Sequence, residues 1–542
     1  MGEKISGQLV DIPLKKVYGV TLYLEGGIIQ SIEKTKSKKG SFIIPGFVDA
    51  HIHIESSMLA PSEFAKLALP FGTLATVSDP HEIANIMGLE GIYFMMENAE
   101  DLPLNILFGA PSCVPASNFE TSGARLNARD VDRLLSDPRI GYLSEVMNYP
   151  GVIHRDPTLM SMIASAKQHK KPVDGHAPGL RGTDLINYFS AGIQTDHECF
   201  TYDEALEKIN LGMKVIIREG SAAKNYVALA PLIAQFPDKI MFCSDDKHPD
   251  DLIKGHINQI VARAVQDGYN LFDVLQIACI NPKKHYHFSG GTLQENDPAD
   301  FVLIEDLESF HVNEVYVSGK LVAKDGQSWI ETKPIPIINK FNCRKIVQED
   351  LEVRALAENI AVIEALDGQL ITNALSHPAR ILNGKVIADP KNDILKIIVL
   401  NRYQPGKPAI GFVKGFGLKA GAIASCVAHD SHNIIAVGID DESICRVVNK
   451  IIDQKGGIAA ALNTFVLGLE LPIGGIMSTQ DGISVAKQYS LLDHFARTDL
   501  KSTFRAPFMT LSFMALPVIP ALKMTDKGLF DGSRFEWTPL FM

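Results

Sequence analysis

Between residues 46 and 289, short apolar runs alternate with longer amphipathic stretches, which is typical of parallel strands that alternate with helices. Eight runs fit strands, and they end near Asp49, Val77, Phe108, Leu143, Val173, Gln194, Ile217 and Cys243. Their spacing of about 28 residues is close to the roughly 31 expected when a barrel of about 250 residues is divided by eight. The pattern therefore predicts a closed (β/α)8 barrel in preference to an open doubly wound sheet.

Two β-rich regions flank this segment. Residues 17–24 and 27–32 form one pair of candidate strands around a Glu-Gly-Gly turn, and a similar texture returns between residues 300 and 323. We expect residues 1–45 and 290–340 to pair into one small composite β domain that is built from both sides of the barrel segment 46–289.

The last 200 residues have a mixed pattern. We expect a helix over residues 347–365, strands over 393–400 and 422–427, and an amphipathic helix over 441–455. The glycine-rich stretch 411–417 does not have the register of a dinucleotide-binding turn. Residues 341–542 are therefore predicted to form a separate α+β domain.

Composition narrows the function classes. Hydrophobic residues make up 46% of the 542 residues and charged residues 21%, which excludes wholesale disorder. The net charge of −11 argues against a nucleic-acid partner, since phosphate backbones need basic surfaces. The N-terminus has no apolar secretory segment, the apolar stretch 507–522 is broken by prolines, and the seven cysteines include no CxxC pair. We expect a cytoplasmic protein without a membrane partner, and the apolar stretches are compatible with a homo-oligomer.

His51 and His53, in the stretch FVDAHIHIE at the end of the first predicted barrel strand, carry the strongest chemical signal. Residues i and i+2 of a strand face the same side, so both imidazoles can point into the barrel while Ile52 and Ile54 face the helices. Alone, such a pair arises more often by chance than as a metal site. Its position favours metal, because barrel chemistry lies at the C-terminal ends of the strands.

Other predicted barrel strands end in further donors. Each donor follows a short apolar run and should emerge on the same rim: Glu145, His176, His197 and Asp245. Singly, each of these residues is more often a surface or capping residue than a metal ligand. Jointly with the two histidines, they predict a metal centre on one rim of one barrel.

Six such donors suit two divalent ions. The two histidines of the first strand and Asp245 would hold one ion. His176 and His197 would hold the other, and Glu145 would bridge the two. All donors are nitrogen or oxygen, which favours Mn(II) or Fe(II), with Zn(II) as the alternative. The nearby cysteines at 199 and 243 are expected to pack rather than to bind metal.

Two neighbouring ions lower the pKa of a bound water toward neutrality and so supply a nucleophile at pH 7. Such a site attacks an electrophilic centre in an ester, an amide, a phosphate ester or an amidine-like ring. A carboxylate must then carry a proton from the water to the leaving group. Asp245 is the candidate for this transfer, and Asp246 and Glu198 are candidates to hold or protonate the substrate.

The chain resembles the amidohydrolase superfamily and, within it, the bacterial-type adenine deaminases. The segments that carry the resemblance are PGFVDAHIHIESSM (45–58), SDPHEIANIMG (78–88), SEVMNYPGVI (144–153), DGHAPGLRG (174–182), TDHE (195–198), REGSAAKN (218–225), CSDDKHPDDL (243–252) and AHDSHNIIAVG (428–438). The HxH pair is common to the whole superfamily, whereas SEVMN, DPHEIAN and REGSAAKN point to this branch.

The resemblance implies a metal-dependent-hydrolase barrel with a small composite β-sandwich and an extra C-terminal domain. It also implies that the small-molecule partner is adenine, which would be hydrolysed to hypoxanthine and ammonia on a binuclear centre of the Mn or Fe type. An acid would protonate or hydrogen-bond the purine ring as charge builds on it, and Glu82, Glu198 and Glu219 remain alternatives. Asp245 would move the proton toward the departing amine.

The family motifs add further candidates. Arg218, Ser221 and His81 would contact the substrate, although an equally good interpretation is that His81 hydrogen-bonds to a metal ligand and orients it. For His429 and Asp430, a structural turn or an interdomain hydrogen bond is the favoured reading.

Three alternatives stay open. The true substrate could be another aminopurine or an aminopyrimidine, because these motifs do not determine the shape of the pocket. A cyclic-amide hydrolase of the dihydroorotase or hydantoinase type would need a lysine where Glu145 stands, and residues 140–146 contain none. A metal-binding scaffold without turnover would have no use for the adjacent carboxylates Asp245 and Asp246.

Overall fold

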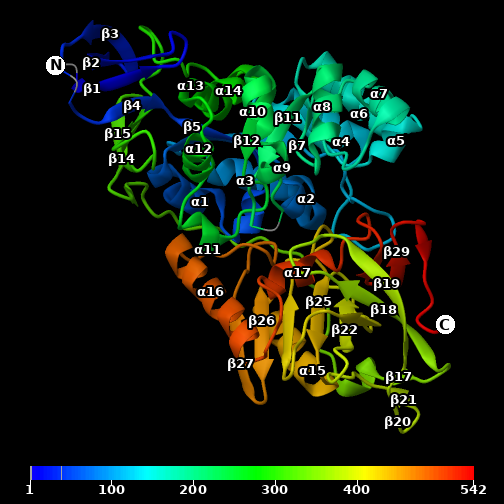
Figure 1. Ribbon diagram of the computed structural model, residues 1–542. Helices are drawn as coiled ribbons and strands as arrows, with labels where there is room; N and C mark the ends of the chain where they lie inside the picture. The colour runs from blue at the N-terminus through cyan, green and yellow to red at the C-terminus, as the bar shows by residue number, and fades with distance from the viewer. Residues whose placement is uncertain (1–2, 38, 222) are drawn as a thin grey trace.

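The computed structural model describes residues 3–37, 39–221 and 223–542. The chain forms two lobes, with the barrel and a sheet from the N-terminal region in one lobe and the C-terminal residues in the other (Figure 1). In the described residues, no helix combines the length and apolar character that a membrane crossing requires.

The barrel has the eight parallel strands that the sequence predicts. In order around the barrel they are β5 (Phe47–Ile52), β6 (Thr73–Ser78), β7 (Asn105–Ala110), β8 (Ile140–Val146), β9 (Val173–Gly175), β10 (Thr195–Asp196), β11 (Lys214–Arg218) and β12 (Ile240–Cys243). Backbone hydrogen bonds close the two seams, from Gln194 N to Val173 O at 2.9 Å and from Asp245 N to His51 O at 2.9 Å. The barrel is therefore continuous from the first strand to the last.

Helices and turns follow the barrel strands and cover the outside of the barrel. They are α1 (Pro61–Ala68), α2 (His81–Met87), α3 (Leu89–Asn98), α4 (Ala128–Ser136), α5 (Tyr149–Ile153), α6 (Pro157–Gln168), α7 (Gly182–Ser190), α8 (Tyr202–Leu211), α9 (Tyr226–Leu229), α10 (Pro231–Gln235), α11 (Pro249–Leu252), α12 (Ile257–Gln266), α13 (Leu271–Leu275) and α14 (Asn281–Tyr286).

Two irregularities in strand pairing decide which side chains enter the barrel. Between the pairs Asp49↔Thr76 and Ile52↔Ser78, two residues of β5 lie opposite one residue of β6. A similar shift lies between the pairs Leu143↔Val173 and Val146↔Gly175. Such β-bulges re-aim side chains next to active sites. The shift in β5 allows His51 to face the barrel axis although Ala50, its immediate neighbour, also packs in the barrel interior.

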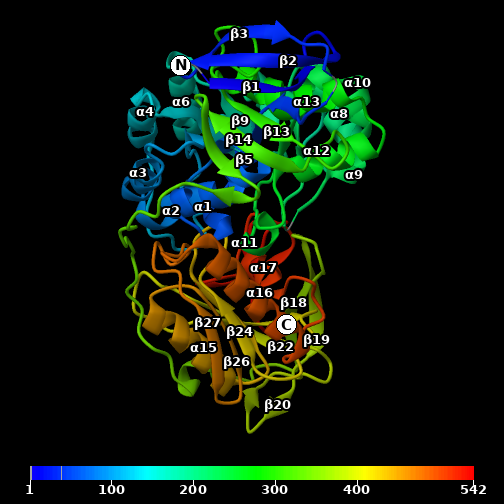
Figure 2. The ribbon, with the colours of Figure 1, turned by 90° about the vertical axis from the view of Figure 1, so that its left-hand side faces the viewer.

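A second sheet joins strands from both sides of the barrel segment and lies at the end of the molecule farthest from the C-terminal lobe (Figure 2). Its order is β16 (Gln327–Ser328), β15 (Lys320–Lys324), β14 (Val312–Val317), β13 (Phe301–Ile304), β4 (Phe42–Pro45), β1 (Glu3–Asp11), β2 (Lys16–Glu25) and β3 (Ile28–Lys34). Strand β4 pairs with both β1 and β13, so it links the two segments. The boundaries of the three predicted domains stay a prediction.

The C-terminal lobe is built around another eight-stranded sheet. Its order is β19 (Thr372–Pro378), β18 (Asn359–Ala365), β23 (Ala409–Lys414), β22 (Leu395–Leu400), β25 (Ile434–Gly438), β24 (Ala422–Ser425), β26 (Ile458–Leu462) and β27 (Phe465–Leu469). Two three-stranded sheets flank it: β17 (Val353–Arg354), β21 (Lys385–Val386) and β20 (Ile381–Leu382), and β28 (Leu522–Thr525), β29 (Gly528–Asp531) and β30 (Glu536–Trp537).

Helix α15 (Asp441–Gln454) packs on one face of this sheet, while α17 (Pro507–Phe513) and α16 (Gly482–Thr498) lie between the sheet and the barrel (Figure 1). The predicted strands and the predicted amphipathic helix of this region are confirmed. The helix expected over residues 347–365 is wrong, because a short 3-10 turn there is followed by the strands β17 and β18. Both faces of β18 are buried, so its apolar residues run without the alternation that marks a strand.

The two lobes share one apolar core, because Ile83 and Ile86 of α2 pack in the same cluster as Ile473 and Ile476. Polar contacts add to this core. Ser478 N donates to Met58 O at 2.8 Å, and a hydrogen bond of 2.8 Å joins the Tyr489 hydroxyl to His248 Nδ1. The C-terminal lobe is thereby fixed over the rim where the barrel strands end.

Candidate metal centre and active site

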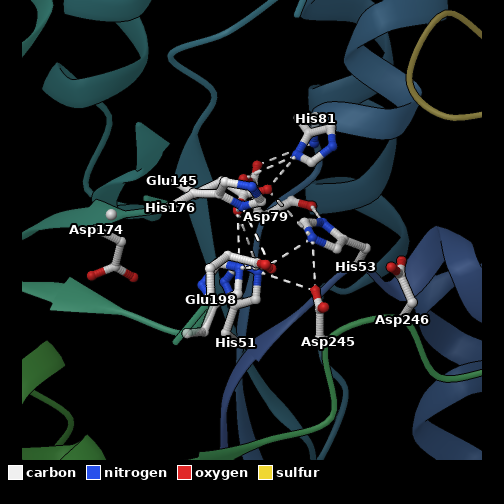
Figure 3. Close-up of polar contacts among 12 residues, drawn as sticks. His51, His53, Asp79, His81, Glu145, Asp174, His176, Glu198, Asp245 and Asp246 are labelled. Atoms are coloured by element: carbon white, nitrogen blue, oxygen red, sulfur yellow. Dashed lines mark hydrogen bonds and ion pairs between the residues drawn. The ribbon is translucent and has the colours of Figure 1, made fainter. Parts of the chain in front are cut away.

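The six predicted ligands converge at the C-terminal rim of the barrel. Figure 3 shows side chains from β5, from β8 and from the loops that follow β5, β9, β10 and β12 directed toward one another, whereas Asp174 lies to one side. The six side chains are His51, His53, Glu145, His176, His197 and Asp245. Five of the six are buried, and His176 is partly exposed. The predicted convergence of these donors is therefore present in the fold.

Three of these donors surround one point. The Nε2 atoms of His51 and His53 are 3.2 Å apart, and Asp245 Oδ1 lies 3.5 Å from the first and 3.2 Å from the second. A backbone contact of 3.1 Å between His53 Nδ1 and Asp79 O orients that ring and leaves its Nε2 toward the cluster. Two imidazole nitrogens and one carboxylate oxygen at these separations form a three-donor site.

The other two histidines, His176 and His197, lie around one carboxylate oxygen of Glu145, Oε2. Its Oε2 atom lies 2.8 Å from His176 Nδ1 and 3.2 Å from His197 Nε2, while its Oε1 atom lies 3.5 Å from His53 Nε2. The His197 ring stacks on His51 with centroids 4.1 Å apart. Glu145 therefore stands between the imidazoles, with Oε2 toward His176 and His197 and Oε1 toward His53.

Charge keeps both carboxylates ionised. Burial alone would raise the pKa of Asp245, but the charge of Arg218 and hydrogen bonds from His51 and His53 hold it well below its usual range. Burial likewise opposes ionisation of Glu145, and His176 and His197 more than reverse that effect on its pKa. Both groups are therefore anionic at neutral pH.

Arg218 is a buried cation that joins two acids of the site. Its guanidinium forms an ion pair with Glu198 and donates to Asp245 Oδ2 at 2.7 Å. Asp245 thus presents one oxygen to the histidines and the other to Arg218. Glu198 also lies 3.5 Å from His197 Nε2, so it supports the cluster from the side of β10.

Asp246 and His81 also lie at the cluster. Asp246 accepts a 2.6 Å hydrogen bond from the Ser56 hydroxyl, and burial followed by the charge of Asp245 raises its pKa. His81 Nδ1 lies 3.1 Å from Asp79 Oδ2 and 3.3 Å from Glu145 Oε1. Asp79, which sequence reasoning missed, orients two histidines of the site through its carboxylate and its carbonyl oxygen. Its position at the end of β6, in the DPHE segment, was the available signal.

A cavity opens next to the cluster, and its walls come from both lobes. The barrel lines it with, among others, His81, Glu82, Glu198, Arg218 and Asp246. The C-terminal lobe lines it with Leu370, His429, Asp430, Phe513, Leu516, Val518 and Ile519. Sequence reasoning missed all the apolar residues in this second list, because nothing in the pattern around residue 370 or in the stretch 507–522 separates a cavity wall from an ordinary core.

Glu82 links the two walls. It lies in the first turn of the barrel helix α2, and its two carboxylate oxygens are hydrogen-bonded to His429 Nδ1 and His432 Nε2 of the C-terminal lobe. The interdomain hydrogen bond predicted for His429 is therefore present. Asp430, between these histidines, is buried, and its Oδ2 atom has no hydrogen-bond partner among the described residues.

Two predicted residues are not brought to the cavity. Glu219 pairs with Arg263 of α12 at 3.2 Å, because Arg218 before it points into the barrel and successive side chains of a strand alternate. The Ser221 hydroxyl donates to Asp251 Oδ2 at 2.7 Å and accepts from His248 N at 3.0 Å, so it fixes a neighbouring loop. The structure therefore gives neither residue a contact with the cluster.

Comparisons with known proteins agree with this arrangement. An amidohydrolase family model matches residues 42–322, and a model described as the adenine deaminase C-terminal domain matches residues 369–536. A protein named adenine deaminase from Sulfurovum sp. is 51% identical over 98% of this chain and 99% of its own length. Another from Salinibacter ruber is 48% identical over 99% of both chains.

Among solved structures, a beta-aspartyl dipeptidase from Fervidobacterium islandicum AW-1 is 14% identical and matches 60% of this chain and 98% of its own, with a TM-score of 0.46. The family assignment rests on the sequence relatives, which match the barrel and the C-terminal lobe together.

Proposed function

The chain belongs to the adenine deaminase family of the amidohydrolases, and from this premise we propose that it hydrolyses adenine to hypoxanthine and ammonia. The observation that carries the proposal is the convergence of four imidazoles and two carboxylates beside a cavity with one polar and one apolar wall. A flat aromatic base with a hydrolysable amino group fits both walls.

We propose that the cluster holds two divalent ions. His51, His53 and Asp245 would bind one, His176 and His197 the other, and Glu145 would bridge. The donor chemistry fits, since all six donors are nitrogen or oxygen, which favours Mn(II) or Fe(II), with Zn(II) as the alternative. When bound, such ions act as Lewis acids and lower the pKa of a water toward neutrality.

The chain's own residues then manage protons and orientation. Asp245 accepts a proton from the attacking water and delivers it to the amino nitrogen at C6 of adenine. The C6–N bond breaks and ammonia leaves. The second proton of the water passes to N1 of the ring, and the oxygen stays on C6 as the carbonyl of hypoxanthine. Arg218, which donates to Asp245 Oδ2, fixes the carboxylate for this transfer.

The contacts of the candidate acids favour different roles for them. Glu198 supports Arg218, and Glu82 faces the cavity while held by two imidazoles. Asp246 lines the cavity and is free to accept a hydrogen bond from the substrate. We assign ring contacts to the Glu82 side of the cavity and a supporting role to Glu198.

Location and assembly remain proposals. Composition and the absence of a basic excess support a cytoplasmic enzyme whose partner is a small molecule rather than a nucleic acid or a membrane. Apolar residues on the surface, among them Phe200 and Val227, are compatible with a homo-oligomer.

Ammonia release tests the function. Purified protein loaded with Mn(II) is mixed in turn with adenine, other amino-bearing bases, dihydroorotate and hydantoin. We expect rapid release from adenine alone. Faster release from another base would change the substrate, opening of dihydroorotate or hydantoin would indicate a cyclic-amide hydrolase, and two bound metals without any release would indicate a scaffold.

A further inference from the structure

His429 is the one imidazole that the C-terminal lobe contributes to the cavity wall among the described residues. It lies in the loop between β24 and β25, and its ring stacks on Phe513 with centroids 4.8 Å apart and planes 16° apart. Its Nδ1 atom is hydrogen-bonded to Glu82. The stacking and this hydrogen bond fix the plane and the rotation of the ring, so its Nε2 edge has a defined direction.

The proton positions follow from the partners. Ionised Glu82 can only accept hydrogen bonds, so Nδ1 of His429 must carry a proton. Burial alone would lower the pKa of His429, but the charges of Glu82 and Asp246 and the hydrogen bond to Glu82 raise it to about 9. At neutral pH the ring is therefore an imidazolium whose Nε2 also carries a proton.

His432 on the same carboxylate behaves differently. Its Nδ1 atom accepts a hydrogen bond from Ala428 N at 3.3 Å, so its Nε2 must carry the proton that is donated to Glu82. Its pKa is lowered, chiefly by burial, and it does not line the cavity. His432 is therefore a neutral side chain that holds Glu82, whereas His429 is a charged side chain that lines the cavity.

This arrangement speaks against a third metal between Glu82 and the two histidines. A metal ligand must present a lone pair, and His432 Nε2 cannot do so while its Nδ1 accepts from the backbone. The three side chains already satisfy one another, with each imidazole on its own carboxylate oxygen.

We propose that His429 is a substrate-contacting residue that donates a hydrogen bond from Nε2 to a ring nitrogen of the purine, with Glu82 as its positioning residue. The inference rests on the proposed deaminase function. As the nucleophile adds to C6, the electron pair of the C6=N1 bond moves onto the ring nitrogens. A charged donor fixed beside the ring stabilises that charge more than it stabilises the neutral base.

Binding of purine and its 1-deaza, 3-deaza and 7-deaza analogues as inhibitors tests this contact. We expect the wild-type protein to bind one deaza analogue about 10- to 100-fold more weakly than purine, because a charge-assisted hydrogen bond is lost. His429→Phe keeps an aromatic ring against Phe513 but has no donor. In this variant purine and that deaza analogue should bind about equally well. The kcat/KM for adenine should fall by about 10- to 100-fold.

Two further variants keep the test decisive. His429→Gln restores an uncharged donor and should recover part of the discrimination. His432→Gln changes the other contact to Glu82 outside the cavity and should retain the discrimination with a smaller loss of activity. Metal content is measured in every variant, so that loss of the binuclear centre is recognised.

The outcomes separate this inference from the function it rests on. Without ammonia release from adenine by the wild-type protein, the proposed function fails. An active wild-type protein whose His429→Phe variant shows an unchanged discrimination pattern overturns the role of His429 alone. A third equivalent of bound metal that is lost in His429→Phe also overturns it, because the group would then be a ligand.

Discussion

The two walls of the cavity differ in chemistry and in how they are built. The barrel wall is crowded with ionisable groups, which are locked by mutual contacts such as those of Arg218 with Glu198 and Asp245. The C-terminal wall is mostly apolar, with His429 and Asp430 as its polar members. The difference suggests a division of labour, in which the barrel performs the hydrolysis and the C-terminal lobe selects and holds the base.

Substitution of Asp245, the proposed proton carrier, should show the largest effect on the barrel side. In Asp245→Asn the carboxylate can no longer accept a proton, and we expect kcat to fall by about 1,000-fold or more. Part of the metal should remain, because the imidazoles of His51 and His53 persist. Ammonia release and atomic absorption on the same sample measure the two quantities. Substantial turnover by this variant would remove Asp245 from the proton path.

Glu145, the proposed bridge between the two ions, provides the next test of the barrel wall. In Glu145→Gln the site loses an anionic ligand between the two groups of imidazoles, so metal affinity should fall by about 100-fold or more. Activity should fall with occupancy and recover in part at high metal concentration. If the variant binds two ions normally and stays fully active, the bridging role is wrong.

Much of the barrel wall can be predicted from the sequence, because the position of each donor depends only on the strand directly before it. A donor directly after a short apolar run lies at the strand end, and strand ends of a barrel share one rim. The limits of that rule are visible at residues 218–221. Arg218 takes the inward face of β11, which turns Glu219 outward, and Ser221 serves a neighbouring loop. A motif match names the segment but not the side from which each residue projects.

The bulges in β5 and β8 are a second limit. Strict alternation places the two histidines of the first strand on one face, yet the pairing shift between Asp49 and Ile52 decides which residues precede them inside the barrel. The shift depends on pairing with β6, which comes later in the chain. Local periodicity therefore predicts the donors but not the backbone irregularity that aims them.

The C-terminal wall was not predicted, because it depends on contacts between segments that are far apart in the sequence. Phe513, Leu516 and Ile519 are apolar residues in an apolar stretch, and only the docking of α16 and α17 on the barrel makes them a cavity wall. The same holds for Glu82 and His429, which are separated by 347 residues. The sequence shows an acid at position 82 and an imidazole at position 429, but it does not show that the two form a hydrogen bond.

Removal of an apolar contact on the C-terminal wall should change substrate binding rather than chemistry. In Leu516→Ala we expect KM for adenine to rise by about 10-fold with kcat and metal content little changed, since the loss of buried apolar area weakens binding of the base. Leu491→Ala, at an exposed position of α16, is the matched control and should behave like the wild-type protein. A fall in kcat at constant KM would contradict the proposed division of labour.

The smallest expected effect concerns a buried lysine that shapes the same wall. Lys523 on β28 is fully buried, and its Nζ atom donates to Leu370 O at 2.6 Å and to Phe513 O at 3.0 Å. Both carbonyls belong to cavity-lining residues. Burial lowers the pKa of Lys523 to about 7, so Lys523→Met should loosen the wall slightly and raise KM for adenine by a few-fold at most.

The same lysine has a stability signature with a definite sign. Between about pH 7 and the ordinary lysine pKa of 10.5, the unfolded chain binds a proton that the folded protein releases, so this group makes stability rise with pH. The free energy of unfolding of the wild-type protein, minus that of Lys523→Met, should therefore increase by about 2–3 kcal/mol at most from pH 7 to 9.5 and stay flat below pH 7. Urea unfolding followed by circular dichroism at pH 6, 7, 8 and 9.5 measures it. A difference that does not change with pH would mean that Lys523 keeps its charge inside the fold, and the two carbonyls would then solvate a cation beside the substrate wall.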